Sequence, residues 1–387
     1  MQAARLAKIG AYLFADLDRK QEELQARGVD VINLGVGDPD LPTPEHIIEA
    51  LTRAARDPQS HRYPPYGGIR DFREAVAAWY RQRFDVTLNP DTEVLALIGS
   101  KEGLAHLPWA VLNPGEVTLV PDPGYPVYRT ATILAEGEPV AVALHADRGF
   151  LPDLGAIPQS VARRARILFL NYPNNPTAGV ATVGFFQEAV RFARDNGMLV
   201  AHDNAYSEIA YDGYRPPSFL QADGAREVGI ELHSLSKTFC MTGWRIGFAV
   251  GNPEAIAALG RIKTNIDSGI FRAVQQAGIA ALTGPQEPLL ERLAIFQRRR
   301  DRVFDALSAI GWRPARPKAT LYFWIEAPGR RTGVEFAGEV LERTGVVITP
   351  GIGYGEQGAR YVRISLTTPD DRLDEALGRL THAFGGT

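Results

Sequence analysis

Hydrophobic and polar residues follow two different periods along this chain. Between residues 94 and 250, short apolar runs rich in β-branched residues alternate with stretches whose apolar residues recur at helical spacing. The apolar runs occupy residues 94–98, 117–120, 139–143, 167–170, 198–202, 228–232 and 246–250. Strands that alternate with helices usually pair in parallel, because a helix carries the chain back across the sheet. The pattern therefore predicts an α/β fold with a mostly parallel sheet and helices on both faces.

The C-terminal third has a different pattern. A long amphipathic stretch at residues 285–310 predicts a connecting helix, and we expect its arginine run at 298–300 to lie on a solvent-exposed face. Strand-like segments follow at 321–326, 346–349 and 361–366, with helical spacing at 334–343 and 370–384. These segments predict a second, smaller α/β unit.

Composition excludes several functional classes. The 387 residues, 45% hydrophobic and 22% charged, predict a folded chain long enough for two domains. A net charge of −3 gives no general attraction to nucleic acid or to an anionic membrane, and no apolar run approaches the ~18 residues of a membrane-spanning helix. The single cysteine, Cys240, fits a reducing compartment, so we expect a cytoplasmic protein. The seven histidines have no metal-ligand spacing, so we expect no metal site.

Polar and aromatic residues follow directly on several of the predicted strands. Ligands of parallel sheets bind beyond the carboxyl ends of the strands, so these residues are candidates for one site. The stretch 99–103 also opens a helix, whose N-terminal amides favour a phosphate. The candidates at five strand ends are Ser100, Lys101, Tyr125, Asn175, Asp203, Tyr206, Ser234 and Lys237. Each alone also fits a turn or a helix cap, but together they supply the separate groups that one cofactor needs.

Lys237 is the residue on which the predicted chemistry depends. Ser234, Ser236 and Arg245 lie near it, and two hydroxyls with a guanidinium suit a dianionic group such as a phosphate. A lysine beside a phosphate-binding set is what a pyridoxal phosphate enzyme requires, because the lysine forms a Schiff base with the cofactor. Asp203 can then keep the pyridine nitrogen protonated. The sequence thus predicts pyridoxal 5'-phosphate as the cofactor.

A rival interpretation of the same stretch is a serine hydrolase. Ser234-Leu-Ser-Lys237 satisfies the S-x-x-K pattern of penicillin-binding serine enzymes. The companion motifs are missing, because no S-D-N occurs and the nearest match to K-T-G is Lys263-Thr264-Asn265. The strand-end residues therefore favour the cofactor enzyme.

The motifs resemble the fold type I, pyridoxal-phosphate-dependent aminotransferases of the aspartate aminotransferase superfamily, over nearly the whole chain. The resemblance lies in Ser234-x-Ser-Lys237 with Arg245, in Asp203-x-x-Tyr206, in Asn175-Pro-Thr177 and in Arg363 of Tyr-Val-Arg-Ile-Ser. It implies that Lys237 is covalently linked to the cofactor, that Asp203 pairs with the ring nitrogen, and that Arg363 binds the substrate α-carboxylate. The other implied contacts are Tyr206 and Asn175 to the phenolic oxygen, Tyr125 stacked on the ring, and Ser100, Lys101, Ser234, Ser236 and Arg245 at the phosphate.

Within the superfamily, the chain is most similar to LL-diaminopimelate aminotransferases, which serve lysine and cell-wall precursor synthesis. The matching stretches lie at residues 35–44, 99–103, 121–128, 203–211 and 263–269. This similarity implies LL-diaminopimelate and 2-oxoglutarate as substrates, with another amino acid (aspartate, alanine, aromatic or aminoadipate-like) as the alternative within the superfamily. The implied substrate-binding residues are Tyr12, Gly37, Lys101, Glu102, Tyr125, Asn175 and Arg363.

The resemblance also implies a homodimer whose two sites are each completed by the neighbouring subunit. Tyr63 matches a tyrosine that reaches the phosphate of the other chain, and Asn265 is a second candidate for this role. It further implies that the N-terminal segment joins the small domain. We therefore expect an N-terminal segment of the small domain (1–44), a large cofactor-binding domain (45–284), and a connecting helix with the small C-terminal domain (285–387).

Two motifs depart from simple expectations. The superfamily usually has glycine directly after the threonine of Asn-Pro-Thr, whereas this chain has Ala178 before Gly179. Residues 353–358 match the dinucleotide fingerprint G-x-G-x-x-G, but a predicted strand follows where a helix is required. We therefore expect no dinucleotide site there.

Overall fold

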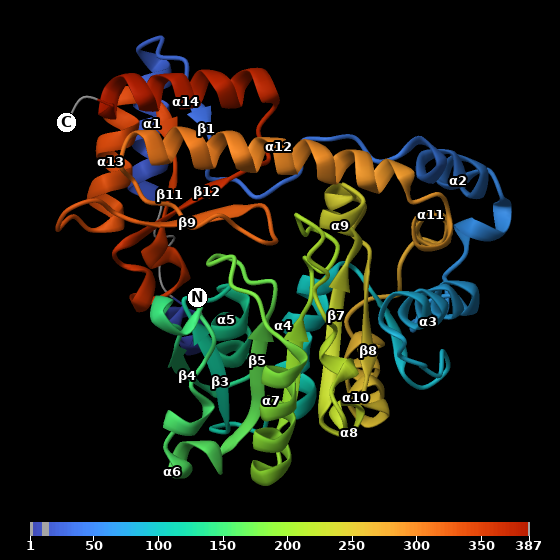
Figure 1. Ribbon diagram of the computed structural model, residues 1–387. Coiled ribbons are helices and arrows are strands. Elements are labelled where there is room, and N and C mark those ends of the chain that lie inside the picture. The colour runs from blue at the N-terminus through green and yellow to red at the C-terminus, as the bar shows by residue number, and fades with distance from the viewer. Residues whose placement is uncertain (1–2, 10–14, 386–387) are drawn as a thin grey trace.

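The computed structural model describes residues 3–9 and 15–385. A seven-stranded sheet with the order β2-β8-β7-β6-β5-β3-β4 forms its larger part (Figure 1). The strands are β2 (Val94–Leu97), β3 (Val117–Asp122), β4 (Glu138–Ala143), β5 (Ala165–Asn171), β6 (Leu199–Asp203), β7 (Gly229–Ser234) and β8 (Gly247–Gly251). Only β8 is antiparallel to its neighbours in this sheet. The predicted α/β fold with a mostly parallel sheet is confirmed.

Helices cover both faces of this sheet because successive strand residues point to opposite sides. In β2, Val94 and Ala96 pack into one hydrophobic core, and Leu95 and Leu97 pack into another. The first core takes residues from α3 (Arg70–Phe84), α7 (Val183–Asn196) and α11 (Arg272–Thr283). The second takes residues from α4 (Ser100–Val111), α5 (Val127–Leu134) and α10 (Pro253–Lys263).

A smaller unit lies beyond the carboxyl ends of the parallel strands (Figure 1). Its antiparallel sheet has the order β11-β12-β9, and a two-residue parallel pairing joins β1 to β10. The strands are β1 (Ile32–Asn33), β9 (Tyr322–Glu326), β10 (Val346–Val347), β11 (Thr349–Pro350) and β12 (Tyr361–Ser365). The helices are α12 (Glu287–Ala309), α13 (Gly333–Thr344) and α14 (Asp370–Phe384). One buried core joins Ile32 and Leu34 to this unit; the domain boundaries at residues 44 and 284 stay a prediction.

The remaining helices are short or lie at the edges. Figure 1 shows the long α12 running from beside α14 toward α2, past the end of the sheet that carries α9. The short or peripheral helices are α1 (Ala15–Ala26), α2 (Glu45–Ala55), α6 (Gln159–Ala162), α8 (Ala225–Val228) and α9 (Leu235–Thr238). The segment 351–358 forms two turns of 3₁₀ helix followed by β12, so it lacks the helix that a dinucleotide fingerprint requires.

The expectation that the arginine run of α12 is solvent-exposed is wrong for two of its three members. Arg299 is 2% exposed and donates to Asp40, to Asp370 and to the Leu366 carbonyl. Arg300 is 1% exposed and donates to Asp212 and Asp301. Carboxylates from distant segments neutralise both guanidiniums, which allows the charges to be buried. Arg299 thereby ties the N-terminal segment to the C-terminal unit.

Candidate active site

Asp203 ends β6 at the centre of the sheet and is 5% exposed. Its Oδ2 accepts a hydrogen bond of 2.8 Å from the Tyr128 hydroxyl, while Asn171 Nδ2 donates to its main-chain oxygen at 2.7 Å. No donor among the described residues reaches its buried Oδ1. Burial raises the pKa of Asp203, and the Tyr128 hydrogen bond opposes that rise. A buried carboxylate oxygen without a partner is costly, so the geometry favours a cationic or N–H group of a ligand at this point.

Arg363 lies in the middle of β12, in the smaller unit, and is 6% exposed. One Nη donates to Asn175 Oδ1 at 2.8 Å, and the other donates to the Gly35 carbonyl at 2.7 Å. Its guanidinium stacks 4.1 Å above the Tyr322 ring, and its Nε has no partner among the described residues. A guanidinium held on both sides can offer its remaining N–H to a carboxylate.

Lys237 lies on α9, the single helical turn that follows β7. Its Nζ donates a 2.7 Å hydrogen bond to the Gly37 carbonyl, which comes from the N-terminal segment. A Cβ added to Gly37 would lie 2.1 Å from the Tyr322 hydroxyl, so only glycine permits this close approach. Tyr322 is hydrogen-bonded in turn to Tyr206, with 2.9 Å between the hydroxyls. The lysine amine, two phenols and the Gly37 main chain thus meet at one point.

Arg245 and the start of α4 form the opposite end of the site. Gly99 precedes α4 with φ +77°, and a Cβ there would lie 2.4 Å from Arg245 Nη2. The guanidinium therefore reaches the helix N-terminus only because residue 99 is glycine. Ser234 caps α9 by accepting from the Ser236 amide at 3.2 Å. Main-chain amides, hydroxyls and a guanidinium together suit a phosphate.

A cavity of about 470 Å³ connects these groups. Most of the residues predicted for the site line it: Gly37, Ser100, Lys101, Tyr125, Asn175, Asp203, Tyr206, Ser234, Ser236, Lys237, Arg245 and Arg363. Burial raises the pKa of Tyr125 to about 12, so its phenol stays neutral at neutral pH. The cavity lies between the strand ends of the large sheet and the smaller unit, as a ligand site of an open α/β sheet should.

Three of the predicted residues that the structure describes do not line this cavity. The carboxylate of Glu102 accepts from the Ile98 amide and contacts His106 and Lys263, so it points away from the cavity. Tyr63 is 84% exposed, and Asn265 is exposed with its Nδ2 donating to the Arg261 carbonyl. Tyr12 lies outside the described residues. Glu102 therefore does not line the cavity of its own chain, and its contact with substrate stays a prediction.

Sequence reasoning missed several residues, of which the clearest are three that line the cavity and one beside it. Asn171 holds the main chain of Asp203, Tyr322 stacks on Arg363, and Tyr354 also lines the cavity. Tyr128 lies behind the cavity wall and donates its hydroxyl hydrogen to Asp203. Asn171 directly follows a predicted strand, and Tyr128 lies in the stretch 121–128, so a strand-end signal existed for both. Tyr322 lies inside an apolar run, and Tyr354 lies in the glycine-rich loop, so neither carries a local signal.

Comparison with known proteins decides the family. A family model described as aminotransferase class I and II matches residues 29–380. The chain belongs to the class I and II aminotransferases. The LL-diaminopimelate aminotransferases of Desulforudis audaxviator and Moorella thermoacetica are 56% and 55% identical to it, covering 100% and 99% of this chain and 98% of each relative. The substrate-bound BacF structure from Bacillus subtilis matches with a TM-score of 0.94 and 39% identity, covering 100% and 99% of the two chains.

As a class I and II aminotransferase, the protein uses pyridoxal 5'-phosphate, and the cavity fits this cofactor. The unpartnered Oδ1 of Asp203 suits a protonated ring nitrogen, and the Arg245 cradle at Gly99 suits the phosphate. Lys237 supplies the amine that binds the aldehyde. The serine hydrolase interpretation has no support in these comparisons. Among the described residues, no cluster of potential metal ligands and no helix able to cross a membrane occurs.

Proposed function

We propose that this aminotransferase exchanges an amino group between LL-diaminopimelate and 2-oxoglutarate. The observation that carries the proposal is full-length similarity of 51–56% identity to LL-diaminopimelate aminotransferases of several bacteria. The geometry supports aminotransferase chemistry, because an amine, a carboxylate with an unpartnered oxygen and an arginine with an unpartnered N–H belong to residues that line one cavity. The substrates are small molecules, an amino acid and a 2-oxo acid.

The residues act on different atoms of the reactants. Pyridoxal 5'-phosphate, when bound, accepts the amino group and serves as an electron sink for the carbanion formed at Cα. Lys237 Nζ would serve as the general base that takes the proton from Cα of the substrate and as the acid that gives it back. Asp203 Oδ1 would accept a hydrogen bond from the pyridine nitrogen and so keep that nitrogen protonated. Arg363 binds and orients the α-carboxylate of the substrate, beside Asn175.

Recognition of the far end of the substrate requires groups beyond Arg363. LL-diaminopimelate carries a second ammonium and a second carboxylate there, and Lys101 lines the cavity with its Nζ 5.8 Å from the Tyr125 ring centre. We infer that Lys101 meets the distal carboxylate and that Tyr12 and Gly37 add polar contacts. Glu102 then acts indirectly, because its contacts with Ile98, His106 and Lys263 hold the start of α4 in place.

We also propose a cytoplasmic homodimer with shared active sites. Tyr63 lies in a proline-flanked loop, exposed beside Phe271, which is 43% exposed. Exposed aromatic side chains that gather in one place are typical of an interface. In the dimer, Tyr63 and Asn265 would reach the phosphate of the partner's cofactor, as the resemblance implies.

The test is a comparison of amino donors with 2-oxoglutarate as acceptor. We expect kcat/KM for LL-diaminopimelate to exceed that for aspartate, alanine and aromatic amino acids by about 10⁴, because a site built to pair polar groups rejects analogues that lack them. The meso isomer should be rejected as well, since its distal ammonium and carboxylate are exchanged in space. Comparable rates with aspartate or an aromatic amino acid would replace the proposed substrate with the alternative in the same family.

A further inference from the structure

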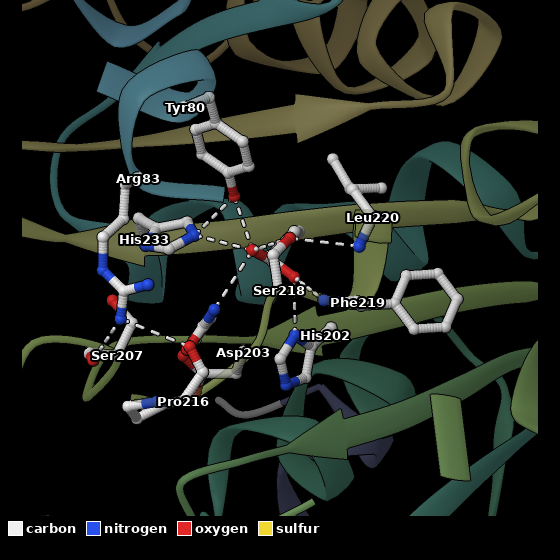
Figure 2. Close-up of polar contacts among 12 residues, drawn as sticks. Tyr80, Arg83, His202, Asp203, Ser207, Pro216, Ser218, Phe219, Leu220 and His233 are labelled. Atoms are coloured by element: carbon white, nitrogen blue, oxygen red, sulfur yellow. Dashed lines mark hydrogen bonds and ion pairs between the residues drawn. The ribbon is translucent and has the colours of Figure 1, made fainter. Parts of the chain in front are cut away.

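A buried carboxylate lies outside the cavity, next to the strand that carries Asp203. Glu231 occupies the middle of β7, is fully buried and does not line the active-site cavity. In Figure 2, Tyr80, His202, His233 and Ser218 point toward a common centre, which the hydrogen bonds assign to Glu231. The proposed mechanism gives this cluster no role.

Donors surround both oxygens of Glu231. Its Oε1 contacts the Tyr80 hydroxyl at 2.5 Å, His233 Nε2 at 2.8 Å, Ser218 Oγ at 2.9 Å and Asn204 Nδ2 at 3.1 Å. Its Oε2 accepts from the Phe219 amide at 2.7 Å and contacts His202 Nδ1 at 2.8 Å. Arg83, also drawn in Figure 2, pairs with Glu208 at 3.0 Å. A carboxylate with this many donors is fixed in position and orientation.

Two of these donors are the chain neighbours of Asp203. His202 precedes it and Asn204 follows it, so Glu231 holds β6 on both sides of the aspartate. The strand pairing places His202 opposite Glu231 and Asp203 opposite Leu232, and the Asn204 amide donates to the Leu232 carbonyl at 2.9 Å. The other ring nitrogen of His202 contacts the Tyr172 carbonyl at 3.1 Å, in the segment that leads to Asn175.

The charges in the cluster also act on Asp203. Burial alone would raise the pKa of Glu231, but the hydrogen bonds and charges of His202 and His233 outweigh it and hold that pKa well below its usual range. Glu231 is therefore ionised at neutral pH. Burial raises the pKa of Asp203, whereas Tyr128, His202 and His233 oppose the rise. The two histidines thus favour the ionised form of both carboxylates.

We propose that Glu231 is a positioning residue, which aims Asp203 Oδ1 at the cofactor's ring nitrogen by holding His202 and Asn204. A buried ion pair often adds little stability over apolar packing of the same volume, so orientation is the role that such a cluster can serve best. The inference rests on cofactor binding in this cavity and is independent of which amino acid is the substrate.

The test uses pyridoxamine 5'-phosphate binding to the apoprotein, because this probe carries the ring nitrogen and the phosphate but forms no bond with Lys237. Glu231→Gln should weaken its binding about tenfold and lower kcat by a similar factor, as loss of a supporting partner commonly does at metal sites. KM for the amino donor should not change, since Arg363 is untouched. Binding of pyridoxamine 5'-phosphate needs no substrate, so the result stands even if LL-diaminopimelate proves not to be the amino donor.

The matched control is Glu93→Gln. Glu93 is 3% exposed and accepts from Arg226 and from the Asn89 amide, away from the cavity. We expect this variant and Glu231→Gln both to lower the midpoint of thermal unfolding, but only the Glu93→Gln variant to keep the affinity for the probe. An equal loss of affinity in both variants would overturn the proposal, because a general loss of stability would then explain it.

A double-mutant cycle distinguishes action through Asp203 from a direct effect. In an Asp203→Asn background, Glu231→Gln should cause no further loss of affinity, since the oriented carboxylate is already gone. An additive loss would overturn the proposal. Should Glu231→Gln fail to fold, Asn204→Ala removes one tether and leaves the carboxylate in place. That variant should weaken probe binding as well, and unchanged affinity in it would contradict the positioning role.

Discussion

The active-site cavity (the inner side) and the exposed loop around Tyr63 (the outer rim) differ in how far one chain covers their side chains. On the inner side, Asp203 and Arg363 are less than 10% exposed and hydrogen-bonded within the chain. On the outer side, Tyr63 is 84% exposed and borders a separate cavity of about 610 Å³ with Phe271. Asp203 and Arg363 lie on paired strands, whereas Tyr63 lies in a loop. One chain therefore positions the groups of the cavity, whereas the exposed side chains of the outer rim would be covered only in the proposed homodimer.

The largest effect should come from the inner side. Lys237→Ala removes the amine that binds the aldehyde and moves the proton at Cα, so kcat should fall by about 10⁴ or more. The yellow absorption of the bound cofactor should change at the same time. Steady-state rates and a visible spectrum measure both, with the exposed Lys318→Ala as the control. Retained activity and an unchanged spectrum in Lys237→Ala would exclude the covalent role.

The next effect concerns substrate orientation. Arg363→Lys keeps the positive charge but loses the planar donor set, at a cost of about 1.5–3 kcal/mol for one charged hydrogen bond, or roughly ten- to a hundredfold in kcat/KM. Arg360→Lys is the control, because that exposed arginine pairs with Glu326 just before β12. Similar kinetics for the two variants would mean that Arg363 does not bind the α-carboxylate.

A complementation experiment tests the outer rim. The Tyr63→Phe variant keeps Lys237, and the Lys237→Ala variant keeps Tyr63. Random exchange of subunits between the two variants gives heterodimers in which one of the two sites has both Lys237 and Tyr63. The mixture should therefore regain about a quarter of wild-type activity if Tyr63 acts across the interface. Tyr66→Phe, in the same exposed loop, should stay active by itself. No recovery after verified subunit exchange would show that each chain completes its own site.

The smallest effect concerns backbone strain beside Asn175. Ala178 has φ +58°, and its amide donates to the Asn174 carbonyl at 2.9 Å. Left-handed backbone costs an L-residue about 1–2 kcal/mol, so Ala178→Gly should raise the free energy of unfolding by roughly 1 kcal/mol or slightly less. Urea unfolding measures this free energy. The control is Ala78→Gly at an exposed position within α3, which should lower the free energy of unfolding. A loss of stability in Ala178→Gly would show that the methyl group is needed there.

The inner site was predictable because its signals are local. An apolar run followed by a polar residue marks a strand end, and Asp203 and Lys237 both follow such runs. Glu102 shows the limit of this signal, since adjacent helical residues point about 100° apart. Lys101 therefore faces the cavity while Glu102 faces Lys263.

The burial and the contacts of residues whose partners are distant in sequence could not be predicted from local patterns. Arg299 is buried because Asp40 reaches it from 259 positions away, and Tyr322 stacks on Arg363 from a different strand. Glu231 is the single charged residue in the apolar run 228–232, and its partner Tyr80 lies 151 positions away in the sequence. Tertiary contacts determine these environments, and no single stretch of sequence encodes them.

The short pairing between β1 and β10 has a consequence for synthesis of the chain. Ile32 pairs with Val346, so the N-terminal segment finds its strand partner only after more than three hundred further residues have been made. At ~5–20 residues per second, that delay is about 15–60 s on the ribosome. Most of the large sheet is complete by then, because its last strand ends at Gly251. We therefore expect Ile32 and Asn33 to become protected from proteolysis in a nascent chain later than the strands of the large sheet.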